Sequence, residues 1–181
     1  MIRVLSTELK DQEIYIIGSI VSQWGFLEAD IFDQTLQTFI DEKPEFPLPK
    51  QMNNLKFTEV LNLWLKRVAE IADKPKKLVL KNQYERIIFL NDYRQAIVHS
   101  RWQYNPSSPQ EITAVRIRKK EIVRVKFTFE DLLNLSQQLG EIRYNINYPG
   151  GEEDRLAKMP AWGYMSRKFN EIMSGNDVSE G

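Results

Sequence analysis

The stretch FLNDYRQAIVHSRW, residues 89–102, ends an apolar-periodic segment and decides how the rest of the chain is interpreted. No proline or glycine interrupts it, and its spacing predicts the end of a helix. It holds the only histidine of the chain, His99, and Arg94 precedes that histidine by five positions. Three more polar residues lie within one turn of the arginine: Asn91, Asp92 and Gln95. This helix end is therefore the first candidate for a functional site.

The composition is that of an ordinary folded protein. The chain has 181 residues, of which 42% are hydrophobic and 28% charged, enough for one well-buried core. Twenty-five basic residues balance twenty-five acidic ones, so nucleic-acid binding would require a local basic patch. No apolar run approaches the ~20 residues of a membrane span, and the N-terminus lacks the pattern of a signal peptide. We expect a cytoplasmic protein with no membrane partner.

Several kinds of chemistry are disfavoured by the residues present. The chain has no cysteine, which excludes disulfides and thiolate chemistry. One histidine without cysteines makes no zinc-ligand cluster, and the acidic pairs lack the spacing of a metal cage. Glycine-rich phosphate loops and a serine-centred nucleophile motif are also missing. We therefore expect no metal and no cofactor.

Apolar residues at three- and four-residue steps predict four helices, at about 11–40, 55–72, 78–99 and 129–147. Proline-containing breaks separate them, and Pro75 is expected to end the second helix. The predicted stripe of the first helix is Ile17, Ile20, Val21, Trp24, Leu27 and Ile31, and that of the second is Val60, Leu61, Trp64, Leu65, Val68 and Ile71. Glu28 points toward the first stripe and needs a partner there, unless it meets water or a surface lysine at the edge.

The period changes from 3.6 to 2 between residues 111 and 127, which predicts a two-stranded hairpin. One face is expected to be apolar. The other is expected to carry four cations, Arg116, Arg118, Arg124 and Lys126. Thr128, followed by Asp131 three positions later, resembles a capping box that starts the last of the four helices. A basic ribbon face suits an RNA backbone, although an ordinary solvated face has the same pattern.

Together these elements predict an all-α bundle over residues 1–150, with the hairpin at about 111–127 inserted between the third and fourth helices. Residues 151–181 form a C-terminal extension, in which 161–173 has the pattern of a short amphipathic helix and 175–181 that of a frayed tail.

An arginine, four residues and a histidine at the end of a third helix resemble the motif of HEPN (higher eukaryotes and prokaryotes nucleotide-binding) domains. The first helix, with IGSIVSQWGFLE at residues 17–28, is also similar to the opening helix of that family. The resemblance covers roughly residues 11–147, and it departs from the family at Gln95, where Asn, Asp or His is more usual. It implies a bundle of four to five helices. It also implies a homodimer in which the motifs of two copies face each other, and in many members metal-independent ribonuclease activity.

Arg94 and His99 are the candidate catalytic residues, and their residue types suit that chemistry. Imidazole exchanges protons near neutrality, and a guanidinium binds a phosphate and stabilises charge developing on it. Five helical residues correspond to a rotation of about 140°, so Arg94 and His99 do not share a face. They converge if the last turn loosens, if the arginine reaches around, or if two copies meet. Glu28, Asp92, Asn91 and Gln95 are the candidate supporting residues, with Asp92 expected to orient His99.

The first hypothesis is therefore a metal-independent endoribonuclease, a toxin or defence effector with RNA as substrate and an antitoxin protein as a possible partner. The second is a HEPN-like module that only binds RNA or associates with protein, in which His99 caps helix carbonyls. A helical protein unrelated to HEPN would place Arg94 and His99 in separate environments. Arg101 and Trp102 are further RNA-binding candidates, although Trp102 and Tyr104 would equally cover a helix end.

Overall fold

The computed structural model describes residues 9–42, 48–53 and 56–158. Within these residues the protein is mostly helical, with one small antiparallel sheet, so the predicted architecture is confirmed in this coarse form. The predicted helix at 161–173 and the predicted tail at 175–181 lie outside the described residues. A short helix that the sequence pattern did not predict, α6 (Glu152–Lys158), follows the bundle.

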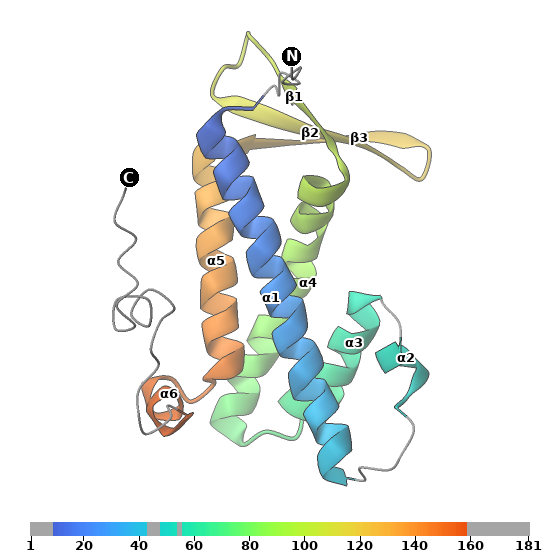
Figure 1. The fold of residues 1–181 in the computed structure, drawn as a ribbon, viewed down its shortest axis with the longest axis vertical. Helices are drawn as coiled ribbons and strands as arrows, with labels where there is room; N and C mark the ends of the chain where they lie inside the picture. The colour runs from blue at the N-terminus through green and yellow to red at the C-terminus, as the bar shows by residue number, and fades with distance from the viewer. Residues whose placement is uncertain (1–8, 43–47, 54–55, 159–181) are drawn as a thin grey trace, which may run out of the picture.

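Three long helices make up the bundle: α1 (Asp11–Glu42), α4 (Lys74–His99) and α5 (Phe129–Asn147). Figure 1 shows α1 beside α5, and α4 packs against both. The predicted helices at 11–40 and 129–147 are confirmed, the first extending two residues further. No helix among the described residues combines the length and the apolar character needed to cross a bilayer.

The start of α4 differs from the prediction for a reason of proline chemistry. The helix was expected near Leu78, with Pro75 as a breaker of the preceding helix. Instead α4 begins at Lys74 and carries Pro75 in its first turn. Backbone N–H groups of a first turn have no partner within the helix, so proline fits there without loss of a hydrogen bond. The proline starts this helix.

The segment predicted as one regular helix at 55–72 is divided. The short α2 (Lys50–Asn53) precedes α3 (Phe57–Trp64), which continues into a single π-helical turn, η1 (Leu65–Ala69). The chain has left the helix before Ile71, whose side chain is 74% exposed rather than buried. In α1, Val21 is likewise 42% exposed. Ile16, which was not part of the predicted stripe, is buried instead.

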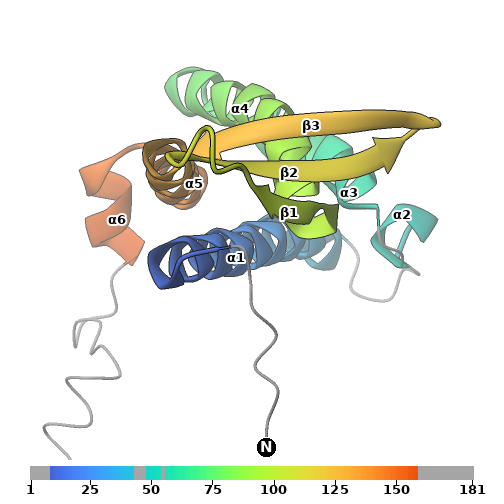
Figure 2. The same cartoon turned by 90° about the horizontal axis from the view of Figure 1, so that it is seen from above.

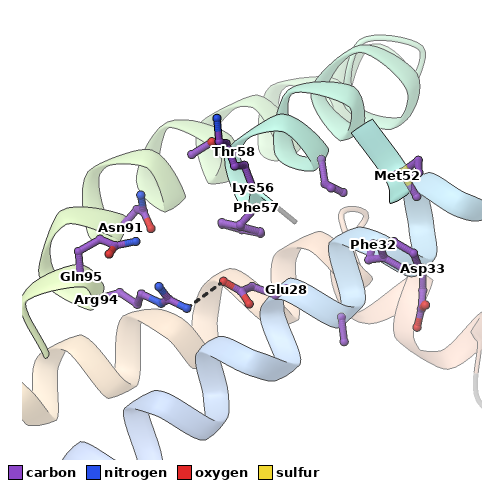
Figure 3. A pocket seen from close by; sticks show the side chains of 12 residues that line it. Glu28, Phe32, Asp33, Met52, Lys56, Phe57, Thr58, Asn91, Arg94 and Gln95 are labelled. Carbon is purple, nitrogen blue, oxygen red and sulfur yellow. Dashed lines mark hydrogen bonds and ion pairs between the residues drawn. The ribbon is translucent and has the colours of Figure 1, made fainter. Parts of the chain in front are cut away.

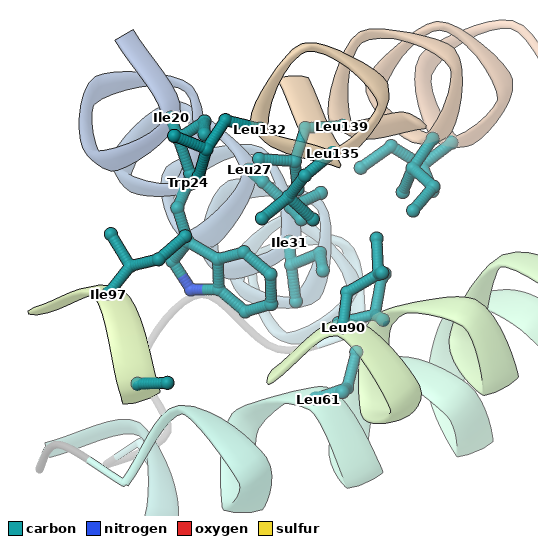
Figure 4. Close-up of a cluster of buried hydrophobic side chains, with 14 of the residues drawn as sticks. Ile20, Trp24, Leu27, Ile31, Leu61, Leu90, Ile97, Leu132, Leu135 and Leu139 are labelled. Carbon is teal, nitrogen blue, oxygen red and sulfur yellow. The ribbon is translucent and has the colours of Figure 1, made fainter. Parts of the chain in front are cut away.

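The buried apolar side chains form one cluster in which α1, α3, α4 and α5 meet. Figure 4 shows the indole ring of Trp24 among them, close to Ile97 of α4. Every α1 stripe residue from Ile20 to Ile31 except Val21 is buried, as are Leu132, Leu135, Leu139 and Ile142, which recur at helical spacing in α5. The labelled members of the cluster are Ile20, Trp24, Leu27, Ile31, Leu61, Leu90, Ile97, Leu132, Leu135 and Leu139.

The sheet has three strands rather than the predicted two, in the order β1 (Arg101–Tyr104), β2 (Glu111–Arg118), β3 (Glu121–Thr128). All neighbours are antiparallel. β1 begins two residues after α4 ends, and α5 follows β3 directly, so the sheet covers one end of the bundle. The β2–β3 hairpin extends past α4, as Figures 1 and 2 show from two directions.

Candidate functional site

His99 is the last residue of α4, and its side chain is exposed. Asn91 and Gln95 lie eight and four residues before it, and this spacing places the three side chains along one face of the helix. The facing wall is formed by Arg116, Ile117 and Arg118 of β2. Helix and strand together enclose an open cavity of about 440 Å³, to which Asp92 also contributes. His99 is therefore accessible from solvent and is placed among polar and cationic groups.

The strand register explains which cations reach this cavity. Ile112 pairs with Phe127 and Ala114 with Val125, and these residues face the bundle. Since side chains alternate along a strand, Arg116 and Arg118 lie on the same face as Ile112 and Ala114. Toward the tip of the hairpin this inner face becomes polar, where it lies beside the open cavity at the end of α4. The two arginines thus lie on the side of β2 that faces α4.

Arg124 and Lys126 lie on the opposite, outer face of the hairpin. Each pairs across the sheet with an odd-numbered residue of β2, Val115 and Thr113 respectively. The Nζ atom of Lys126 lies 2.7 Å from a carboxylate oxygen of Glu111 on that face. The predicted single basic face with four cations is therefore wrong. Across the two-residue turn, even-numbered residues of β2 pair with odd-numbered residues of β3. Arg116 and Arg118 therefore lie on the inner face, and Arg124 and Lys126 lie on the outer face.

Within the cavity the ionic contacts differ from those expected. Asp92 was predicted to orient His99, but its carboxylate instead lies 3.3 Å from Nη1 of Arg118. Both side chains of this pair are more than half exposed, so the pair is readily exchanged for a ligand. The Nε atom of Arg116 is buried and has no hydrogen-bond partner among the described residues. A buried donor without a partner is costly, so the described residues do not hold the Arg116 guanidinium in its best environment.

Arg94 lies in a different environment from His99. Its Nη2 atom is 3.5 Å from Oε1 of Glu28 on α1, and the same carboxylate oxygen accepts a 2.8 Å hydrogen bond from Nε1 of Trp24. Figure 3 shows the arginine extending from α4 toward Glu28. Of the two possibilities for Glu28, the structure therefore gives it Arg94 as a partner. The Arg94 side chain is only 23% exposed.

Arg94 and Glu28 line a second and larger cavity of about 620 Å³ between α1, α3 and α4. Its other walls come from residues that the sequence pattern did not mark as functional: Ala29, Phe32, Asp33, Met52, Lys56, Phe57, Thr58 and Val60. Asn91 and Gln95 line both cavities, so the two are neighbours along α4. Residues from α1, α2, α3 and α4 meet here only in the folded chain, which is why no local motif pointed to them.

The remaining candidates are on β1. Arg101 is exposed and pairs with Val115, so it lies on the outer face of the sheet. Trp102 lies on the inner face opposite Ala114, and its ring centroid is 5.8 Å from that of Phe127. Its side chain is half-buried in this contact. Of the two roles considered for Trp102, the covering of the bundle end is the one its position favours.

The geometry thus unites His99 with Arg116 and Arg118, and it separates His99 from Arg94 by the helix rotation that the spacing predicts. Comparison with known proteins adds nothing to this picture. No family model, no curated protein and no solved structure matches the chain.

Proposed function

We propose that this protein is a metal-independent endoribonuclease. The observation that carries the proposal is the exposed His99 in a cavity that it shares with Arg116 and Arg118. In the proposed reaction the ribose 2′-oxygen attacks phosphorus and the bond from phosphorus to the 5′-oxygen breaks. The products are a 2′,3′-cyclic phosphate and a free 5′-hydroxyl. The imidazole transfers a proton, and the guanidinium groups stabilise the charge on the phosphate oxygens.

The reaction needs one proton removed and one delivered, whereas the chain has a single histidine. Pairing of two copies would bring a second His99 to the same phosphate. The resemblance of the Arg94 and His99 spacing to the HEPN motif supports such a homodimer, and so does the exposure of His99. Arg94 lines the neighbouring cavity, so within one chain we assign it to substrate binding beside the scissile phosphate. An RNA-cleaving effector of defence or a toxin, held in check by an antitoxin protein, is the proposed biological setting.

A second function is favoured by one specific observation. Arg94 is held by Glu28 and lines a different cavity from His99, which is the arrangement expected of a helical protein unrelated to HEPN. In that case the same cationic cavity would bind RNA or an acidic protein without cleaving it. The two functions differ in whether a phosphodiester bond is broken.

A cleavage assay separates them. Wild-type protein is incubated with a mixed-sequence RNA in the presence of a chelator, beside His99→Ala. We expect wild type to cleave and leave cyclic-phosphate ends, and the variant to be slower by at least about a hundredfold. Because His99 is exposed, the melting temperature of the variant should match that of wild type. Intact RNA with wild-type protein would favour the binding function, and equal rates for both proteins would exclude His99.

A titration tests the shared site. Increasing amounts of His99→Ala are added to a fixed amount of wild type and allowed to exchange. If two histidines act on one phosphate, mixed pairs are inactive and the activity falls steeply as the variant is added. If each chain acts alone, the activity stays constant.

A further inference from the structure

The larger cavity lies beside the proposed catalytic site and has the character of a ligand pocket. It is about 620 Å³ in volume and joins apolar walls, including the ring of Phe57, to a few polar groups. Phe57 is held in place by the indole of Trp24, whose ring centroid lies 5.8 Å away at an interplanar angle of 72°. The aromatic wall is thus supported from the core, and Phe57 itself lines the pocket.

The polar groups of this pocket have unused hydrogen-bonding capacity. The Nε atom of Arg94 is buried and has no partner among the described residues. Oε1 of Glu28 accepts from Trp24 and Arg94, whereas Oε2 accepts no hydrogen bond from the described part of the chain. The side-chain amides of Asn91 and Gln95 likewise make no hydrogen bond with any residue that the structure places. Apart from the contact between Arg94 and Oε1 of Glu28, these donors and acceptors line one pocket without bonding to each other.

We propose that this pocket binds the RNA base next to the cleaved bond and that the base is guanine. The inference depends on the proposed ribonuclease function, since it names the specificity of that reaction. Bases of single-stranded RNA are recognised by stacking on aromatic rings and by hydrogen bonds to their edges. Phe57 provides the ring, and the ion pair of Glu28 with Arg94 provides an acceptor beside a donor.

Guanine fits the set of polar groups better than the other bases. It offers two acceptors, O6 and N7, which are the common target of an arginine. It also offers adjacent N–H donors at N1 and N2, which carboxylate and amide oxygens accept. Glu28, Asp33, Asn91 and Gln95 all carry such oxygens and line the pocket. Adenine and cytosine have a single amino group on this edge, and uracil has one N–H, so each leaves more of these acceptors without a donor.

The two cavities are placed so that one nucleotide can occupy both. Asn91 and Gln95 form their common wall, and His99 follows Gln95 by one helical turn, about 6 Å along the axis. A base beside Phe57 would therefore place its phosphate near His99 and Arg116. This is why the pocket is assigned to a base that flanks the cleaved bond.

Cleavage of a matched RNA set tests the assignment. The RNAs are identical except for the single base beside the cut, and wild type is compared with Glu28→Gln, which keeps an acceptor for Trp24. We expect guanine to be preferred by about tenfold in wild type and the preference to disappear in the variant. Glu85→Gln, on an exposed position of α4 outside both cavities, should keep it. Cleavage without a base preference, or with preference for another base, would overturn the assignment while the ribonuclease function stands.

A binding measurement is independent of cleavage. Wild type is titrated with guanosine, adenosine, uridine and cytidine monophosphates, and tryptophan fluorescence is followed, because Trp24 shares Glu28 with the proposed ligand. All four nucleotides carry the same phosphate, so a difference between their affinities reflects recognition of the base. Binding of the guanosine nucleotide about tenfold tighter than the others supports the pocket even if no RNA is cleaved. Equal affinities for all four nucleotides overturn it.

Discussion

The two cavities on either side of Asn91 and Gln95 differ in how their charged residues are held. On the Arg94 side, the arginine contacts Glu28, and Glu28 in turn accepts from the buried Trp24, so the polar groups are tied to the core. On the His99 side, the histidine is exposed, and the ion pair of Asp92 with Arg118 faces solvent. One face of α4 thus carries polar groups anchored to the core, and the other carries polar groups that are open to solvent.

Two residues that are close together in a sequence motif therefore need not contact the same part of a ligand. Five positions along a helix rotate a side chain by about 140°, enough to send Arg94 toward α1 and His99 toward β2. The cations that do accompany His99, Arg116 and Arg118 of β2, come 17 and 19 residues later in the chain. The proposed chemistry therefore depends on the hairpin as much as on the helix.

The largest effect should come from exchanging an arginine on the inner face of the hairpin. Arg116→Ala removes a guanidinium from the wall of the His99 cavity, and we expect the cleavage rate to fall by about a hundredfold, since such groups stabilise charge on the phosphate. Arg124→Ala removes the same group from the outer face of the paired strand and should change the rate less than about threefold. Rates are measured on one RNA at saturating concentration. Equal losses in both variants would show that the hairpin acts only through its overall charge.

On the Arg94 side the expected effect is on stability. Glu28→Ala leaves the buried Nε1 of Trp24 without an acceptor, which should lower the free energy of unfolding by about 1–3 kcal/mol. Glu28→Gln keeps an oxygen at that position, and its free energy of unfolding should fall by less than half as much. Chemical denaturation of both variants measures the difference. If the two are equally destabilised, the hydrogen bond to Trp24 is not what Glu28 contributes.

The local patterns were predicted well, and the relations between distant segments were not. The period of the apolar residues gave α1 and α5 nearly to the residue, because a helix is specified by its own sequence. The division of cations between the hairpin faces depends on the register set by the Lys119-Lys120 turn, which alternation within one strand does not determine. The turn places both lysines at positive φ, 50° and 69°, without the glycine or asparagine that usually signals it.

Substitution at the junction of β3 and α5 should lower the free energy of unfolding by a smaller amount, and this loss should depend on pH. The predicted capping box is confirmed: the hydroxyl of Thr128 accepts from the backbone N–H of Asp131, whose carboxylate accepts from the N–H and the hydroxyl of Thr128. Thr128→Ala should cost about 1 kcal/mol. These hydrogen bonds lower the pKa of Asp131 from its ordinary value of 3.8, and the bond from the Thr128 backbone has the largest effect. The stabilisation is therefore complete above about pH 4 and is lost as the pH falls through the lower folded-state pKa.

Melting temperatures measured from pH 2 to 7 check this sign. Asp131→Asn should lie below wild type at neutral pH, and the two curves should converge in acid, where the wild-type carboxyl is protonated. A difference that stays constant across the range would mean that the charge of Asp131 does not contribute.

The smallest effect is expected at the exposed pair on the His99 side. Asp92→Asn removes the carboxylate beside Arg118, and since both side chains are more than half exposed, the free energy of unfolding should change by less than about 0.5 kcal/mol. The freed guanidinium should bind RNA about twofold more tightly, because an internal anion no longer competes for it. Fluorescence anisotropy with a labelled RNA, on the His99→Ala background to prevent cleavage, measures the affinity. The gain should shrink as salt is raised. A loss of affinity would instead mean that Asp92 holds Arg118 in the position that RNA requires, and the His99 side would then be as preorganised as the Arg94 side.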